Sequence, residues 1–144
     1  MSIFRPERTF FCFEEITPSI LKRENVKLLI CDLDNTLRLH KHKQPEKILQ
    51  DWVKTCKKAG VKLMVFSNNG RKKMMQEFCR PLNLTCVWWA AKPFTKKLER
   101  AIKENQIPKK EIVMLGDKIM TDVLGAHFAG IRAWKVEHRK KFYD

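Results

Sequence analysis

Two carboxylates follow directly on an apolar stretch of the chain. Residues 26–31 read Val-Lys-Leu-Leu-Ile-Cys, and Asp32 and Asp34 come next. A short apolar run predicts a buried strand of a parallel sheet, and such sheets bind their ligands at the carboxyl ends of strands. Side chains at i and i+2 of an extended segment share a face, so both acids can approach one phosphate from the same side. This spacing predicts a catalytic carboxylate pair.

Three more predicted strands end in polar side chains. Taken singly, each of these residues is an ordinary turn or cap residue. Because the carboxyl ends of parallel strands meet at one edge, the whole set predicts one crevice in which hydroxyl, amide and ammonium groups bind phosphate beside several acids. The residues are Ser67 and Asn68 after the run 61–66, Lys92 after the run 84–88, and Asp117 after the run 112–115, with Asp122 five residues further on.

These residue types together indicate phosphoryl transfer. Several carboxylates within a few Å repel one another unless a cation joins them, and oxygen ligands suit Mg²⁺. Asp32, Asp34 and Asp117 are therefore the expected ligands of a Mg²⁺ cofactor. In the predicted reaction Asp32 attacks phosphorus, and Asp34 protonates the leaving alkoxide before it deprotonates the attacking water. Ser67 and Lys92 are expected to bind the phosphate oxygens during transfer.

Strands that alternate with amphipathic helices position this crevice. The alternation predicts an α/β fold: a three-layer Rossmann-like open parallel sheet of about five strands, with helices on both faces. We expect one domain, residues 1–144, with an N-terminal arm (1–15) and a basic tail (137–144). The predicted strands cover 26–31, 61–66, 84–88, 112–115 and 131–136, and the predicted helices cover 18–23, 45–59, 71–82, 93–105 and 118–129.

Cysteine usage and hydropathy indicate the compartment. The five cysteines are odd in number and widely scattered, which favours a reducing cytosol over a disulfide framework. No apolar stretch reaches the roughly 18 residues that span a bilayer, and the N-terminus lacks the apolar centre of a signal peptide. We therefore expect a cytoplasmic protein.

The chain is strongly basic, with a formal net charge of +14. Such a charge attracts nucleic acid, anionic lipid or phosphorylated substrates, although it also serves plain solubility. The N-terminal arm combines aromatic and basic residues, which suits either peripheral contact with the inner membrane face or packing of its rings on the domain. The residues concerned are Phe4, Phe10, Phe11 and Phe13 with Arg5 and Arg8.

The polar strand ends resemble the four motifs of the haloacid-dehalogenase-like (HAD) phosphatases, in order and in position. The resemblance implies that the first Asp is the nucleophile, that the second is the acid/base and a metal ligand through its backbone carbonyl, and that the later acids hold Mg²⁺. It thus adds Asp122 to the predicted metal ligands. The matching segments are Asp32-Leu33-Asp34-Asn35-Thr36-Leu37, Ser67-Asn68-Asn69, Lys92-Pro93 and Gly116-Asp117-x-x-x-Thr121-Asp122.

Within HAD subfamily IIIA, the chain resembles the bacterial branch related to phosphatidylglycerophosphate phosphatases. Asn35 in the first motif, Ile16-Thr17-Pro18 upstream and the run 121–126 carry this narrower likeness. The chain departs from the pattern at residues 40–43, His-Lys-His-Lys, where members of the branch often have an acidic or aromatic connection. This departure leaves the catalytic residues intact, but it concerns the part of the pattern on which the assignment of the substrate depends.

Many HAD phosphatases carry a cap domain, inserted after the first or the second motif, that closes over small substrates. The gaps between the motifs of this chain are too short for such a large cap domain. This favours a large substrate, or a lid supplied by an oligomer mate. We expect a phosphate-ester substrate, first of all the anionic lipid phosphatidylglycerophosphate, hydrolysed to phosphatidylglycerol at the membrane surface. A phosphoprotein, a nucleic-acid end or a soluble phosphate ester would keep the same chemistry. A basic RNA- or ribosome-binding module on the same fold is a different class of function, and the sequence leaves the oligomeric state open.

Overall fold

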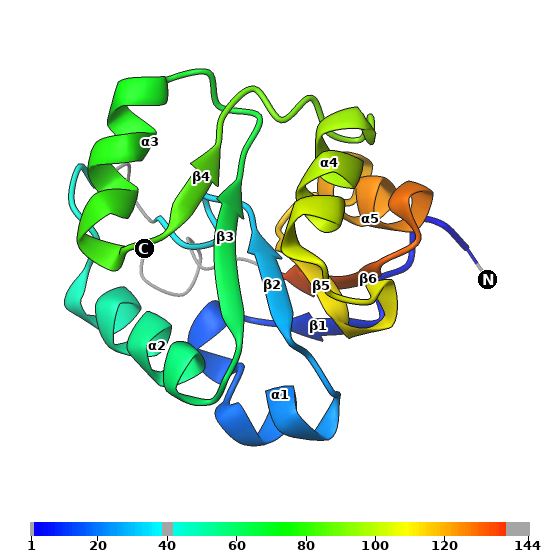
Figure 1. The fold of residues 1–144 in the computed structure, drawn as a ribbon, viewed down its shortest axis with the longest axis horizontal. Helices are drawn as coiled ribbons and strands as arrows, with labels where there is room; N and C mark the ends of the chain where they lie inside the picture. Colours follow the sequence, from blue (N-terminus) through cyan, green and yellow to red (C-terminus); the bar gives the residue numbers. More distant parts are fainter. Residues whose placement is uncertain (1, 39–41, 138–144) are drawn as a thin grey trace.

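Six parallel strands form an open sheet in the computed structural model, which describes residues 2–38 and 42–137. Their order across the sheet is β1-β6-β5-β2-β3-β4 (Figure 1). Every neighbouring pair is parallel, as the alternation of strands and helices predicts. The strands are β1 (Arg8–Phe10), β2 (Leu28–Cys31), β3 (Lys62–Phe66), β4 (Thr85–Val87), β5 (Ile112–Gly116) and β6 (Arg132–Val136).

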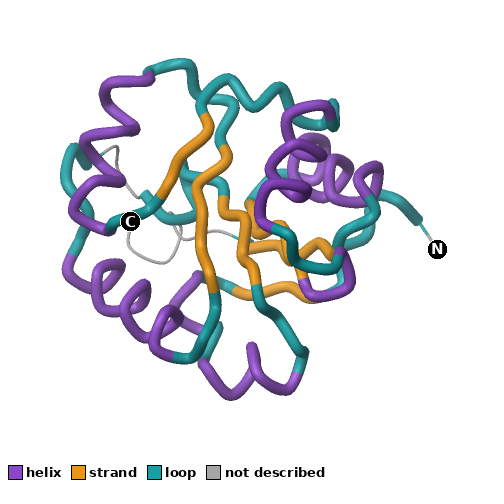
Figure 2. Tube along the Cα trace, viewed as in Figure 1, coloured by secondary structure: helices purple, strands orange, loops and turns teal. Residues whose placement is uncertain are grey.

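Helices cover both faces of the sheet, so the predicted three-layer architecture is confirmed (Figure 2). One apolar cluster joins α1, α2 and α3 to one face, and a second joins α4 and α5 to the other. The longer helices are α1 (Pro18–Arg23), α2 (Lys47–Lys58), α3 (Lys72–Cys79), α4 (Lys96–Asn105) and α5 (Leu124–Ala129). Short turns are η1 (Phe13–Glu15), η2 (Arg80–Leu82), η3 (Lys109–Glu111) and the π-helical η4 (Ile119–Val123).

Strand β2 lies inside the sheet and is buried along its whole length. Its alternate side chains point to opposite faces: Leu29 and Cys31 enter one apolar cluster, and Leu28 and Ile30 enter the other. The chain proceeds from β2 to β3 and β4 on one side, whereas β5 and β6 lie on the other side. Such a reversal of strand order opens a crevice at the carboxyl ends of the strands. Asp32, the residue after β2, stands at this point.

The five strands expected from sequence are all present, and β1 is an additional edge strand. The predicted N-cap of α1 is confirmed, because Thr17 Oγ1 accepts a hydrogen bond from Ile20 N at 3.3 Å. The helix expected to begin at Pro93 begins three residues later at Lys96. Residues 91–94 form a turn instead, closed by a 2.9 Å hydrogen bond from Phe94 N to Ala91 O.

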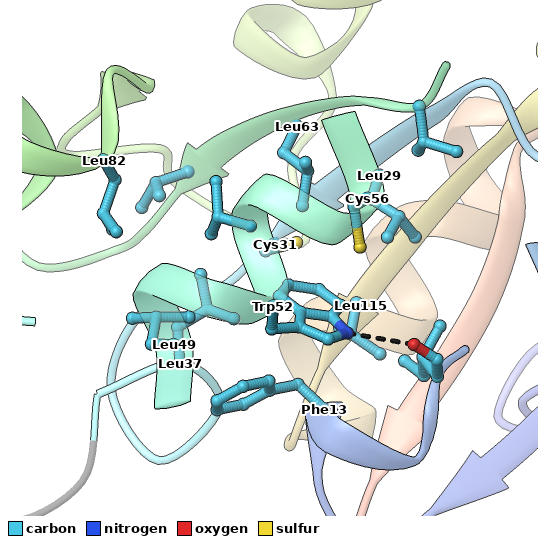
Figure 3. Packing of buried hydrophobic residues seen from close by; sticks show 14 of the residues in the cluster. Phe13, Leu29, Cys31, Leu37, Leu49, Trp52, Cys56, Leu63, Leu82 and Leu115 are labelled. Carbon is cyan, nitrogen blue, oxygen red and sulfur yellow. Dashed lines mark hydrogen bonds between the residues drawn. The ribbon is translucent and has the colours of Figure 1, made fainter. Parts of the chain in front are cut away.

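Part of the N-terminal arm packs on the domain. Phe10 and Phe13 are buried, and the ring of Phe13 lies 5.0 Å from that of Trp52 (Figure 3). Phe4 and Phe11 stay exposed. Two of the four phenylalanines of the arm therefore pack their rings on the domain, which is one of the two roles that the sequence suggests for them.

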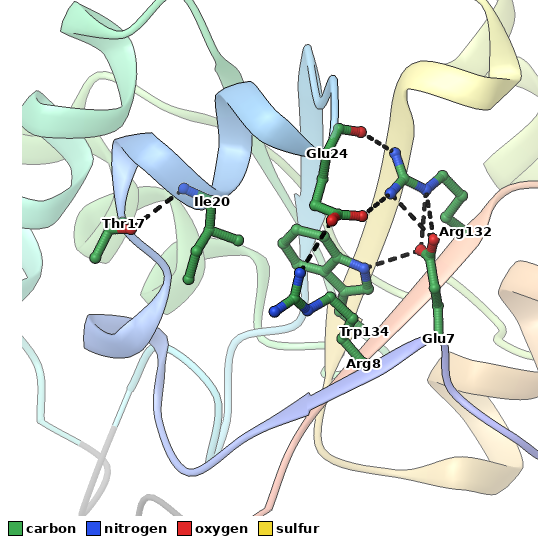
Figure 4. A network of polar contacts seen from close by, with 7 residues as sticks. All are labelled: Glu7, Arg8, Thr17, Ile20, Glu24, Arg132 and Trp134. Carbon is green, nitrogen blue, oxygen red and sulfur yellow. Dashed lines mark hydrogen bonds and ion pairs between the residues drawn. The ribbon is translucent and has the colours of Figure 1, made fainter.

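A network of ion pairs ties the same arm to β6 and α1 (Figure 4). The Arg132 guanidinium lies 2.9 Å from Glu7 and 3.0 Å from Glu24. Arg8 pairs with Glu24 at 3.0 Å, and Trp134 Nε1 donates to Glu7 at 3.0 Å. A single exposed ion pair contributes little to the stability of the fold. A connected and partly buried set of ion pairs, however, fixes the geometry of the segments that it joins.

The crevice carries no inserted domain within the described residues, as predicted. Between β3 and β4 lie only α3 and η2, and β5 leads directly into η4. His40, Lys41 and residues 138–144 of the predicted tail lie outside the described residues. No helix in the described part of the chain is long and apolar enough to cross a membrane.

Candidate active site

A cavity of about 230 Å³ opens at the carboxyl edge of the sheet, where the sequence predicts the crevice. The segments that follow β2, β3, β4 and β5 supply its walls. The predicted residues Asp117 and Asp122 adjoin it through Asp32. The lining residues are Asp32, Asp34, Ser67, Asn68, Asn69, Lys92, Lys118 and Thr121.

Lys92 joins two of the predicted acids. Its ammonium lies 3.0 Å from Asp32 Oδ1 and also pairs with Asp122, and all three residues are buried. Burial lowers the pKa of Lys92, but the charges of Asp32 and Asp122 outweigh it and hold the pKa above its ordinary value. Lys92 is therefore a fixed positive charge beside the predicted nucleophile.

Three carboxylates converge behind this lysine. One ligand oxygen from each of Asp32, Asp117 and Asp122 lies within 4.8 Å of the others. Burial, together with the charge of Asp32, raises the pKa of both Asp117 and Asp122 to about 6. The mutual repulsion of these acids is the reason that a cation would stabilise them.

Asp34 is not a member of this cluster. Its Oδ1 accepts hydrogen bonds from Arg38 Nε at 2.8 Å and forms an ion pair with Arg38 Nη2 at 2.6 Å, while its Oδ2 accepts from Asn69 Nδ2 at 3.0 Å. Arg38 is buried, and Asp34 is partly exposed to the cavity. The carboxylate that the sequence assigns to acid/base chemistry is thus held in one orientation at the cavity wall.

Ser67 and Asn68 follow β3 with different surroundings. Ser67 is buried, and its hydroxyl accepts from Asn69 N at 3.1 Å. The Asn68 amide is engaged on both sides by the main chain of Lys92: Nδ2 donates to Lys92 O at 3.0 Å, and Oδ1 accepts from Lys92 N at 2.8 Å. Asn68 lines the cavity as predicted, and these contacts show that it also fixes the segment that carries Lys92.

A family model and a curated relative match the chain that builds this site. The HAD-hydrolase-like model matches residues 89–138, which include Lys92, Asp117 and Asp122. The chain is 35% identical over 127 residues to the Probable phosphatase YqeG of Bacillus subtilis (strain 168), and the match covers 88% of this chain and 73% of that protein. The chain belongs to the HAD-like phosphatase family. Its activity is therefore that of a phosphatase, as the motifs predict.

Solved structures share the fold of this HAD phosphatase. An uncharacterized protein from Listeria monocytogenes serotype 4b superposes with a TM-score of 0.61 at 21% identity, covering 76% of this chain and 78% of that one. A Legionella pneumophila protein assigned to HAD subfamily III A gives 0.53 at 18% identity, covering 67% and 58%. At these identities the likeness concerns the fold alone.

The acids of this HAD phosphatase fit a divalent cation. Asp117 Oδ1 is buried and has no hydrogen-bond partner among the described residues, so this oxygen is available as a metal ligand. Asp32 and Asp122 complete a set of oxygen donors, which suits a hard cation such as Mg²⁺. A cation bound there would screen the negative charge of the phosphate. The Asp34 carboxylate, a predicted ligand, is not part of this set, and the family resemblance assigns only its backbone carbonyl to the metal.

Gly116 is required by the approach of Asp122. A side chain at Gly116 would overlap the Asp122 carboxylate, which lies directly against the glycine. Asp122 Oδ2 also accepts from Lys118 N at 3.2 Å, so the π-helical turn returns this acid to the end of β5. The close approach of Asp122 thus explains on steric grounds why the residue before Asp117 in the fourth motif of this HAD phosphatase is a glycine.

Arg38, which contacts Asp34, was not predicted as a site residue, and neither were the lining residues Asn69, Lys118 and Thr121. Arg38 directly follows the first motif, and its side chain is buried and turned toward Asp34. A tight turn causes this, in which Asn35 has a left-handed backbone (φ 64°) and its N–H donates to Arg38 O at 2.9 Å. The available signal was the i, i+4 spacing of an acid and an arginine on either side of an asparagine.

Proposed function

We propose that this HAD phosphatase is a Mg²⁺-dependent phosphomonoesterase that converts phosphatidylglycerophosphate to phosphatidylglycerol at the membrane surface. One observation carries the proposal: the cavity with its acids and lysine opens at the sheet edge, and residues 2–38 and 42–137 contain no inserted domain that could cover it. An uncovered site suits a phosphate that stands on a large body, such as a bilayer. The motif likeness to phosphatidylglycerophosphate phosphatases supports the same substrate.

The proposed reaction proceeds in two displacements. In the first, an Asp32 oxygen bonds to phosphorus, the ester P–O bond breaks, and Asp34 donates a proton to the leaving alkoxide. In the second, Asp34 takes a proton from water, the water oxygen bonds to phosphorus, and the Asp32–phosphorus bond breaks to release phosphate. Lys92, beside Asp32, balances the charge of the phosphoryl oxygens, and Ser67 hydrogen-bonds to them. A metal bound by the acid cluster would supply further charge neutralisation.

Phosphate release tests the proposal directly. The substrates are phosphatidylglycerophosphate in vesicles, a 5′-phosphorylated oligonucleotide, a phosphopeptide and a soluble sugar phosphate, each with Mg²⁺ and with chelator. We expect turnover of the lipid, its loss with chelator, and its loss in Asp32→Asn. Preference for any of the other substrates would replace the proposed substrate, and full activity of Asp32→Asn would refute the proposed nucleophile.

The net charge of +14 favours one alternative, a basic module that binds RNA or the ribosome. The convergence of Asp32, Asp122 and Lys92 favours a catalytic site instead, because RNA is bound by exposed cations rather than by buried acids. Salt-dependent RNA binding without turnover of any phosphate ester would reverse this order.

A further inference from the structure

Four large hydrophobic side chains stand exposed beside the cavity. Their exposed fractions are 63% for Trp89, 75% for Phe94, 38% for Ile119 and 61% for Met120. We call these four residues the apolar rim. All four lie in the two segments that leave β4 and β5 at the carboxyl edge of the sheet. A group of exposed apolar side chains at a site entrance is the mark of an interaction surface, because single exposed residues are common but clustered ones are not.

The two segments that carry the apolar rim are in contact with each other. Lys92, on the first segment, pairs with Asp122, on the second. The backbone of Pro93 packs against Gly125, where an added Cβ would lie 3.4 Å from Pro93 Cα. Lys118, which directly precedes the exposed pair on the second segment, lines the cavity itself. The apolar rim therefore borders the opening through which a phosphate enters.

The backbone holds Trp89 in its exposed position. Trp89 has a left-handed conformation (φ 50°), which a bulky residue rarely adopts without support. Trp89 N donates to Asn69 O at 3.1 Å, and Lys97 Nζ donates to Trp89 O at 2.5 Å. The indole also lies directly over Gly70, where any side chain would overlap it. This exposed ring is thus fixed in place rather than left without contacts.

Positive charge accompanies the apolar rim. Residues 67–73, 88–97 and 117–122 form the carboxyl-edge segments after β3, β4 and β5, and their acidic residues are Asp117 and Asp122, both members of the acid cluster. The exposed cations of these segments lie at the same edge of the sheet as the apolar rim. They are Arg71, Lys72, Lys73, Lys96, Lys97 and Lys118.

We propose that the apolar rim and these six cations form a membrane-docking surface that seats the site on an anionic bilayer. Aromatic and aliphatic side chains enter the region between headgroups and acyl chains, and lysines and arginines at the same level bind lipid phosphates. Seating the rim in the bilayer would also cover the open cavity and exclude water from it. The inference rests on the proposed function in one respect, since it takes a lipid phosphate as substrate.

The composition of the apolar rim favours a bilayer over RNA. Bases stack on aromatic rings and guanidinium planes, whereas Ile119 and Met120 offer only aliphatic surface. Acyl chains accept all four side chains alike. Charge attraction alone would suit either polyanion, so the apolar part of the surface decides between them.

Vesicle binding tests the inference with the double variant Phe94→Ser/Met120→Ser. We expect this variant to bind phosphatidylglycerol-containing vesicles at least about tenfold more weakly than wild type in sedimentation, since it loses two apolar side chains that docking would remove from water. Its ratio of turnover on vesicle-borne lipid to turnover on p-nitrophenyl phosphate is expected to fall by a similar factor. Vesicles of phosphatidylcholine alone are expected to bind wild type weakly.

The matched control is Phe128→Ser, which removes an exposed ring near the end of α5, outside the three segments. We expect it to bind vesicles as wild type does. Vesicle binding of the rim variant equal to wild type, or a rim variant that loses affinity for RNA and not for vesicles, would overturn the inference. Vesicle binding through the rim without turnover of phosphatidylglycerophosphate would refute the proposed substrate and leave the docking surface standing.

Discussion

The guanidinium of Arg38 holds the Asp34 carboxylate from one side, with Nε 2.8 Å and Nη2 2.6 Å from Oδ1. Asn69 holds the other oxygen at 3.0 Å. Nη1 of Arg38 lies 3.2 Å from Met74 Sδ, so the guanidinium is itself fixed by packing against α3. The carboxylate proposed to transfer protons is therefore oriented by a buried arginine that is not among the residues lining the cavity.

Replacing Arg38 separates proton transfer from phosphoryl transfer. In Arg38→Met the Asp34 carboxylate loses its orientation, and kcat/KM for an alkyl phosphate is expected to fall on the order of 100-fold, the size of a general-acid contribution. The loss for p-nitrophenyl phosphate is expected to be much smaller, since p-nitrophenolate leaves without a proton. The values of kcat/KM on both esters measure the difference, because kcat/KM reports the first displacement, whereas the second displacement uses Asp34 with either ester. Arg38→Lys, which keeps the charge, is expected to recover part of the alkyl phosphate rate, and equal losses on both esters would assign Arg38 a purely structural role.

The main parts of the site could be predicted from sequence because they follow buried strands. Residues 28–31 are apolar throughout and buried on both faces, so the position of Asp32 at the end of β2 follows from the pattern. The same reasoning places Ser67 after β3 and Asp117 after β5. Their convergence follows in turn from the parallel sheet.

Side-chain direction could not be predicted in this way. Asp32 and Asp34 both line the cavity, but nothing in their spacing indicates that a turn at Asn35 brings Arg38 against the Asp34 carboxylate. Strand β1 was missed because it has only three residues and lies at the sheet edge, too short for a period to show. The exposed position of Trp89 depends on a left-handed backbone that no local pattern indicates.

Removing the charge of Lys92 is expected to destabilise the fold. In Lys92→Met the buried carboxylates of Asp32 and Asp122 lose their partner, and the free energy of unfolding at pH 7.5 is expected to fall by about 3–5 kcal/mol. The loss is expected to shrink at pH 5, where Asp122 takes up a proton because its pKa is raised to about 6. Urea unfolding without metal at both pH values measures this. Lys103→Met, on the exposed face of α4, is expected to stay within about 0.5 kcal/mol of wild type, and an equal effect of the two substitutions would contradict a structural role of Lys92.

The acid cluster also predicts how metal-free stability depends on pH. The pKa of Asp117 and of Asp122 is raised from the ordinary 3.8 to about 6, so between these pH values the folded protein binds more protons than the unfolded chain. Their contribution to stability is therefore fully present below about pH 4 and is lost as pH rises through 6. Asp117→Asn removes one such group, so the unfolding free energy of wild type minus that of the variant is expected to decrease from pH 4 to pH 7. A difference that stays constant with pH would show that Asp117 titrates normally.

Gly116→Ala tests whether the approach of Asp122 to the end of β5 is needed for metal binding. The added methyl group would overlap the Asp122 carboxylate, which is itself held by Lys92 and Lys118 and can move only by breaking those contacts. We expect a loss of about 1–3 kcal/mol in unfolding free energy, as for other overpacked sites, together with weaker Mg²⁺ binding in calorimetry. Gly60→Ala is the control: its backbone is left-handed (φ 84°) and no atom lies within 4 Å of the added Cβ, so it is expected to reduce stability by about 1 kcal/mol without changing Mg²⁺ affinity. If Gly116→Ala binds Mg²⁺ as wild type does, the close approach of Asp122 to the end of β5 is not needed for metal binding.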